Sequence, residues 1–142
     1  VRELRDWDIV SGVGITALGV AAARAVETSR ADALVRDPYA ADFVRSADRL
    51  HHAGEDIADD DRRWLPISVF LGLRSRFLDE YLLDSCRGGG EEGAGQVVVL
   101  AAGLDSRAFR LPWPPGVTVH EVDQPRVLEF KDTVLDRSGA EP

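Results

Sequence analysis

Residues 97–123 read VVVLAAGLDSRAFRLPWPPGVTVHEVD, and this stretch decides the fold. The run at 96–101 (QVVVLA) is β-branched and has no polar residue after Gln96, which is typical of a buried parallel strand. A turn and a short helix are predicted over 103–110, and a second strand over 117–122 (VTVHEV). Asp123-Gln124-Pro125 then opens a helix that runs to about residue 136.

The chain before this stretch is predicted to be helical. Apolar residues repeat at helical spacing over 15–28 and, more strongly, over 64–86. Between them Asp37 is suited to cap a short helix, with Pro38 as its first residue. Helices followed by strand, helix, strand and helix favour an α/β doubly wound sheet. We therefore predict an N-terminal helical region at 1–95 and the first part of a ligand-binding domain at 96–142.

Composition excludes several classes of protein. The net charge of −8 argues against a general nucleic-acid or anionic-membrane binder, because both need a basic surface. Cys86 is the single cysteine, so no intramolecular disulfide forms, and we expect it to pack in the protein. The sequence has no run of eighteen apolar residues, and residues 1–8 do not resemble a signal peptide. We expect a cytoplasmic protein.

The polar segment 49–63 holds the residue types that bind metals. It contains His51-His52 and the run Asp59-Asp60-Asp61. Adjacent histidines point in different directions on a helix, and the spacing matches no established metal site. We expect a solvated loop or an exposed helix start here, and no metal.

A ligand site is predicted where the first strand ends. Gly103 lets a ligand approach the backbone closely, and open α/β sheets bind ligands at the carboxyl ends of their strands. The second strand ends in Glu121-Val122-Asp123, about twenty positions after the glycine, where an acidic residue accepts hydrogen bonds from a ribose diol. Alternation puts Glu121 and Asp123 on one face, so either residue could reach the sugar. We favour Asp123, because it stands at the end of the strand.

The glycine turn also bears on the type of cofactor. The sequence has neither GxGxxG nor GxxxxGK[ST], and a pyrophosphate needs more backbone N–H groups than one glycine turn offers. This argues mildly against NAD, which stays an alternative. S-adenosylmethionine has no phosphate; it needs an acid for its ribose and cations for its carboxylate.

Four phrases carry a family resemblance: DPYAADFV, LRSRFLDEYLL, VVVLAAGLDSRAFRLPWP and EVDQPRVLEFK. Together they resemble the actinobacterial S-adenosylmethionine-dependent methyltransferases of the leucine carboxyl methyltransferase family, from about residue 7 to the C-terminus. The resemblance implies a Rossmann-like class I methyltransferase sheet, incomplete here, after the helical region. It implies S-adenosyl-L-methionine as cofactor and a small-molecule methyl acceptor as substrate.

The resemblance also implies roles for single residues. Gly103 would lie against the methionyl part of the cofactor, and Asp123 would hold the ribose hydroxyls. Arg74 would pair with the carboxylate, which suits a bidentate guanidinium; Arg76, on another helix face, is the second choice. The alternatives without a role in ligand binding are that Asp123 only caps a helix and that Arg74 is an ordinary surface residue.

The loop after the glycine turn is expected to be held by charges. Asp105 and Arg107, in GLDSR, would lie near the pocket and brace the loop by an ion pair. A structural role is favoured over a catalytic one for both. Methyl transfer is a direct displacement in which the enzyme orients the acceptor and excludes water. An ionised carboxylate needs no general base and a hydroxyl does, and no base is identified in the sequence, so the catalytic residues stay unknown.

The length of the chain sets one further expectation. In the family the sheet continues, a later acidic segment contacts the adenine, and the acceptor pocket is largely built there. We therefore predict a truncated form or one half of an assembly that binds S-adenosylmethionine weakly or not at all when alone. The alternative function is an inactive interaction half, which self-associates or pairs with another chain through its unfinished sheet edge.

Overall fold

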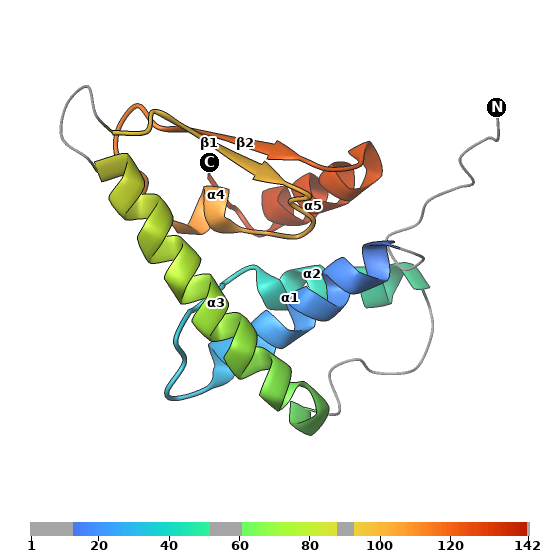
Figure 1. Cartoon of the computed structure of the whole chain (residues 1–142). Coiled ribbons are helices and arrows are strands. Elements are labelled where there is room, and N and C mark those ends of the chain that lie inside the picture. Colours follow the sequence, from blue (N-terminus) through green and yellow to red (C-terminus); the bar gives the residue numbers. More distant parts are fainter. Residues whose placement is uncertain (1–12, 52–60, 88–92, 142) are drawn as a thin grey trace.

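The computed structural model describes residues 13–51, 61–87 and 93–141. Figure 1 shows a long helix, α3, running beside a helical layer and up to a small sheet. The elements in chain order are α1 (Val13–Ser29), α2 (Ala40–His51), α3 (Asp61–Arg87), β1 (Gln96–Leu100), α4 (Arg107–Arg110), β2 (Thr118–Val122) and α5 (Pro125–Arg137). His52, Asp59 and Asp60 of the polar segment and part of the glycine linker, residues 88–92, lie outside the described residues.

The two strands pair in parallel, as predicted. The register runs from Gln96 opposite Thr118 to Leu100 opposite Val122, and α4 lies in the connection between the strands. Burial differs from the prediction, because only one face of β1 is covered by the described residues. Val97 is buried, whereas Val98 and Leu100 are 57% and 73% exposed. The expectation of a fully buried strand is therefore wrong for β1.

The hydrophobic core joins the two halves of the chain. Its buried residues are Leu18, Ala21 and Ala22 of α1, Phe43, Val44 and Ala47 of α2, Leu104 of the turn, and Val127, Val134 and Leu135 of α5. The predicted segments 1–95 and 96–142 both contribute to this core. Since Leu104 follows Gly103 directly, burying Leu104 fixes the glycine turn against α1 and α2.

Asp37 caps α2, as the sequence predicts. Its Oδ1 accepts hydrogen bonds from the backbone N–H groups of Tyr39, at 3.0 Å, and of Ala40, at 3.2 Å. Helix α2 begins at Ala40, and Pro38 and Tyr39 form a turn before it. Because the helix begins at Ala40, Pro38 is not its first residue; it stands in the capping turn, directly before the two N–H groups whose hydrogen bonds Asp37 accepts.

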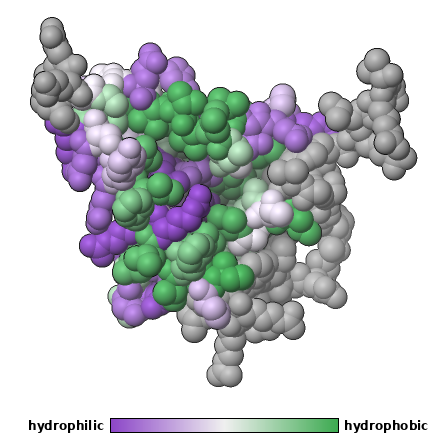
Figure 2. All heavy atoms as spheres, in the orientation of Figure 1, coloured by the Kyte–Doolittle hydropathy of each residue, from purple (hydrophilic) through white to green (hydrophobic). Residues whose placement is uncertain are grey.

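Helix α3 has one buried and one exposed face. Its buried face carries polar side chains, Ser68, Ser75 and Asp79, beside Leu71, Leu83 and Cys86. The exposed face carries Phe70, Leu73, Phe77 and Tyr81, which are 60–66% exposed. Figure 2 shows hydrophobic side chains along this region with hydrophilic ones between them. Within the described residues, no helix has the length and apolar character that crossing a lipid bilayer requires.

Candidate functional site

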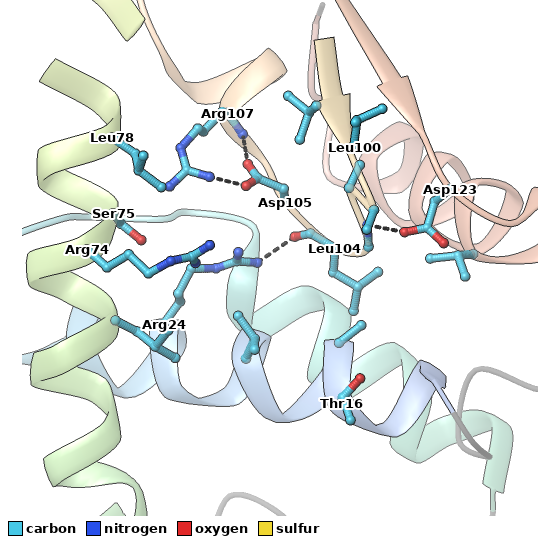
Figure 3. Close-up of a pocket in the computed structure, with 18 of the residues that line it drawn as sticks. Thr16, Arg24, Arg74, Ser75, Leu78, Leu100, Leu104, Asp105, Arg107 and Asp123 are labelled. Atoms are coloured by element: carbon cyan, nitrogen blue, oxygen red, sulfur yellow. Dashed lines mark hydrogen bonds and ion pairs between the residues drawn. The ribbon is translucent and has the colours of Figure 1, made fainter. Parts of the chain in front are cut away.

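A cavity of about 510 Å³ lies at the carboxyl end of β1, between this strand and helices α1 and α3 (Figure 3). The glycine turn, the residue after β2 and the start of α5 also border it. The polar residues that line it are Thr16, Arg24, Arg74, Ser75, Asp105, Arg107 and Asp123. Four of the five predicted site residues, Gly103, Asp123, Arg74 and Asp105, belong to its wall, and Glu121 does not.

The glycine turn has an unusual backbone. Gly103 has a φ of +52°, and Ala101, two residues earlier, has a φ of +51°. Glycine adopts this left-handed region without strain, whereas a residue with a Cβ is strained in it, so the conformation favours a glycine at position 103. The turn leaves the Gly103 N–H directed at the next strand, where it donates a 2.7 Å hydrogen bond to Asp123 Oδ2.

Asp123 joins the ends of the two strands. Its Oδ2 accepts from Gly103 N, and its Oδ1 accepts from Gln124 N at 2.7 Å. Gln124, not Asp123, is the N-cap residue of α5, and no side chain caps that helix. A carboxylate has about four acceptor positions. The half-buried Asp123 side chain therefore keeps acceptor capacity beside the cavity, as a ribose diol would require.

Glu121 lies one pleat earlier in β2 and has another partner. Its Oε1 accepts a hydrogen bond from Lys131 Nζ at 2.5 Å, and Lys131, on α5, is fully buried. The Lys131 ammonium also lies 5.9 Å from the centre of the Phe109 ring. Burial raises the pKa of the Glu121 carboxyl and outweighs the opposing effect of Lys131. Alternation puts both acids on one face, but only Asp123 reaches the cavity.

The two candidate arginines of α3 point in different directions. Arg74 lines the cavity, and in Figure 3 its side chain extends from α3 toward Arg24. No carboxylate among the described residues pairs with it. Arg76 instead forms an ion pair with Glu80, with 2.9 Å between its Nε and Glu80 Oε1, on an exposed face. The structure thus places Arg74, the first choice, at the cavity and Arg76, the second choice, away from it.

Arg24 is a lining residue that the sequence reading missed. It is buried on α1, and its Nη2 donates a 2.5 Å hydrogen bond to the Leu104 carbonyl oxygen. Its Nε lies 3.0 Å from Asp37 Oδ2, an ion-pair distance without hydrogen-bond geometry. Burial lowers the pKa of the guanidinium, against the effect of Asp37. One signal was available: Arg24 interrupts the alanine-rich run at 21–25, in which a charge is out of place.

The predicted brace between Asp105 and Arg107 is confirmed. The two side chains form an ion pair, and Arg107 N donates to Asp105 Oδ1 at 2.8 Å. The brace extends to α3, because Arg107 Nε donates to Asp79 Oδ1 at 2.7 Å. Arg110 makes a bidentate contact with the same Asp79 carboxylate, at 2.7 and 2.9 Å. Asp79 and Arg110 were not predicted, and their charges tie α4 to α3.

The charge of the described cavity wall suits an anionic group. It includes three arginines, Arg24, Arg74 and Arg107, and two aspartates, Asp105 and Asp123. Asp105 is paired with Arg107, which leaves Arg24 and Arg74 on one side of the cavity and Asp123 on another. Within residues 13–51, 61–87 and 93–141, no cluster of three metal-ligating side chains is found. The arrangement can hold a ligand that presents a carboxylate and a diol.

Comparison with known proteins gives a consistent result. Residues 17–142 match the family model described as leucine carboxyl methyltransferase. Three relatives are each named "Putative S-adenosyl-L-methionine-dependent methyltransferase". They are 54% identical over 139 residues in Mycobacteroides abscessus, 50% over 134 in Saccharopolyspora erythraea and 47% over 149 in Mycobacterium tuberculosis. These alignments cover 94–96% of this chain but only 44–46% of the relatives, so the chain spans less than half of their length.

Proposed function

Because the chain belongs to the leucine carboxyl methyltransferase family, we propose that its cavity binds S-adenosyl-L-methionine and serves a methyltransferase. The observation that carries this proposal is the meeting, in one cavity, of a glycine turn, a carboxylate with free acceptor positions and two arginines, of which Arg24 is held by Asp37 and Leu104 and Arg74 pairs with no carboxylate among the described residues. The volume of about 510 Å³ lies within the range of about 300–1,000 Å³ that is usual for small-molecule sites.

The residues divide between the two ends of the cofactor. Asp123 would accept hydrogen bonds from the ribose hydroxyls, and the Gly103 turn would lie against the methionyl part. Arg74, with Arg24 behind it, would pair with the carboxylate, since guanidinium groups bind carboxylates bidentately. Asp105 would support the turn through its ion pair with Arg107.

The reaction we propose is methylation of a carboxylate or hydroxyl oxygen on a small molecule. The cofactor, when bound, would supply an electrophilic methyl group: the acceptor oxygen would bond to the methyl carbon as the S–CH₃ bond breaks, and S-adenosylhomocysteine would be the leaving group. This chain would hold the cofactor by its ribose and carboxylate and so fix the direction of the S–CH₃ bond, which is an orientational contribution to the rate. A carboxylate acceptor reacts in its ionised form, whereas a hydroxyl acceptor needs a base.

Calorimetric titration tests the proposal, with S-adenosylmethionine at concentrations high enough to detect the weak binding expected of this chain alone. Arg74→Ala should weaken binding about tenfold or more, the usual effect of losing a charged hydrogen bond. Arg76→Ala is the matched control, because Arg76 lies two residues away on the same helix and pairs with Glu80 outside the cavity. It should change the affinity less than twofold. Equal losses in the two variants would contradict the placement, and tighter binding of NAD would contradict the choice of cofactor.

A second candidate function follows from the exposed apolar surface. Phe70, Leu73, Phe77 and Tyr81 form a stripe on α3, and one face of β1 is open. We propose that these surfaces pair with another polypeptide, including a second copy of this chain. Sedimentation of the wild type and of Phe77→Glu would test this. If the wild type sediments as an associated species and Phe77→Glu as a monomer, the result supports the proposal. If the purified wild type is itself a monomer, the result contradicts self-association.

A further inference from the structure

The side chain of Asp37 is buried deep between the helices and the glycine turn, and its two oxygens face different partners. Only 2% of the residue is exposed. Its Oδ1 caps α2 through Tyr39 N and Ala40 N. Its Oδ2 accepts a 2.7 Å hydrogen bond from Ser106 Oγ and lies 3.0 Å from Arg24 Nε. Oδ1 thus caps α2, whereas Oδ2 contacts Ser106 and the cavity-lining Arg24.

Capping alone does not explain a carboxylate at this position. An asparagine or serine caps a helix about as well and avoids the burial of a charge. The negative charge does have a counterpart, since the Arg24 side chain is itself only 9% exposed and borders the cavity. A buried arginine without a neighbouring anion would be strongly disfavoured. Asp37, which does not line the cavity, supplies that anion.

Ser106 connects the same oxygen to the glycine turn. It is buried, it is the N-cap residue of α4, and it follows Gly103 by three positions. Arg24 meets this turn as well, through its hydrogen bond to the Leu104 carbonyl. Asp37, Arg24 and the turn therefore form one connected polar group, although Asp37 and Ser106 are 69 residues apart.

We propose that Asp37 is a positioning residue for the carboxylate end of the cofactor site. It fixes the Arg24 guanidinium at the cavity wall and, through Ser106, holds the loop that follows Gly103. A cation held in place before the ligand arrives loses less conformational freedom on binding. This inference rests on the proposed binding of S-adenosylmethionine. Asp37 itself lies outside the cavity lining, so its effect on the ligand is indirect.

The variant Asp37→Asn separates this role from capping. Its amide oxygen can still accept from Tyr39 N and Ala40 N, whereas its amide nitrogen replaces the anionic oxygen beside Arg24. Asp32→Asn is the matched control, because Asp32 is exposed and pairs with Arg30 away from the cavity. The probes are S-adenosylmethionine and 5′-methylthioadenosine, which shares the adenosyl group but has no carboxylate.

Asp37→Asn should weaken S-adenosylmethionine binding about tenfold, because a charged contact is disturbed. It should change the binding of 5′-methylthioadenosine less than twofold. A merely structural role would weaken both ligands equally, so equal losses, or no loss, would overturn the proposal. If Asp37→Asn does not fold, the same titrations are made with Ser106→Ala. This variant loses one neutral hydrogen bond, so its affinity for S-adenosylmethionine should fall about threefold and its affinity for 5′-methylthioadenosine should not change.

A second measurement does not depend on ligand binding. The Arg24 Nε–Hε signal in a ¹H–¹⁵N spectrum, assigned by its loss in Arg24→Lys, reports on the place of the guanidinium, because Arg24 Nε lies 3.0 Å from Asp37 Oδ2. Asp37→Asn should shift or broaden this signal, because the anion that holds the guanidinium is removed, and Asp32→Asn should leave it unchanged. An unchanged signal in Asp37→Asn would overturn the positioning role. If the wild type bound neither probe while the Arg24 signal changed as expected, the proposed function would fail and the positioning of Arg24 by Asp37 would stand.

Discussion

Glu27 fills the space over Gly72 in which any other residue would carry its Cβ. A Cβ built on Gly72 would lie 2.7 Å from both Cδ and Oε1 of Glu27, which is closer than carbon atoms approach in proteins. Glu27 is buried and cannot swing away freely, because its Oε1 accepts a 2.7 Å hydrogen bond from Leu34 N and its Oε2 pairs with Arg30. Gly72 therefore sets how closely α1 and α3, which form two walls of the cavity, approach each other.

Gly72→Ala should destabilise the protein. Overpacking typically costs about 1–3 kcal/mol, and the higher helix propensity of alanine offsets up to about 1 kcal/mol of it. We expect a net loss of about 1–2 kcal/mol in the free energy of unfolding by urea. Gly95→Ala is the control, because a Cβ there meets nothing within 4 Å, and it should stay within about 0.5 kcal/mol. In a Glu27→Ala background the penalty of Gly72→Ala should fall; an unchanged penalty would refute the contact with Glu27 as its cause.

Ala101→Gly should stabilise the protein. Ala101 has a φ of +51°, where a side chain with a Cβ is strained by about 1–2 kcal/mol. Glycine removes this strain but makes the unfolded chain more flexible, which offsets about 0.5–1 kcal/mol. We expect a net gain of up to about 1 kcal/mol in urea unfolding. The adjacent Ala102, which is buried, serves as the control: Ala102→Gly should lose stability, and losses in both variants would show that Ala101 is not strained.

The features that could be predicted from the sequence are those that short local sequence patterns encode. Helical spacing gave α1 and α3, the β-branched run gave β1, and Asp37 was identified as a cap because its partners lie two and three residues away. Long-range electrostatic contacts were not predicted. Arg24 meets Leu104 across 80 positions, and Asp79 meets Arg110 across 31, so no local pattern signals either pairing.

The two acids at the end of β2 show a similar limit. The two-residue period of a strand places Glu121 and Asp123 on one face, but it does not tell which side chains lie next to each of them. Which of the two faces the cavity depends on the neighbours of each side chain, and Glu121 is paired with Lys131. The choice of Asp123 rested on its place at the strand end, and that is the reason it lines the cavity.

Asp79→Ala should cause the largest loss of stability among these variants. Removing this carboxylate leaves Arg107 and Arg110 buried without their main partner, and breaking a buried ion pair costs about 3–5 kcal/mol. Arg107 keeps Asp105, so we expect the lower end of this range. Thermal or urea unfolding measures it. Asp84→Ala, which breaks an exposed pair with Arg87 on the same helix, should change stability by less than about 0.5 kcal/mol. Similar losses in the two variants would show that the network at Asp79 contributes no more than a surface pair.

Glu121→Gln should change how stability depends on pH. Burial raises the pKa of Glu121 in the folded protein above its ordinary value of 4.5, with Lys131 opposing this effect. Between the ordinary and the raised pKa the folded state therefore keeps a proton that the unfolded state has released. Stability from this group is complete below pH 4.5 and is lost as the pH rises through the raised pKa.

The variant removes this titration, and its amide oxygen can still accept the hydrogen bond from Lys131. Unfolding free energies measured from pH 4 to pH 7 should therefore decline less with rising pH in Glu121→Gln than in the wild type. Glu129→Gln is the matched control, because Glu129 is exposed on the same helix as Lys131, and it should reproduce the wild-type slope. If Glu121→Gln followed the wild-type slope as well, the carboxyl of Glu121 would titrate alike in the folded and unfolded states. Its contact with Lys131 would then fully compensate the burial of its charge.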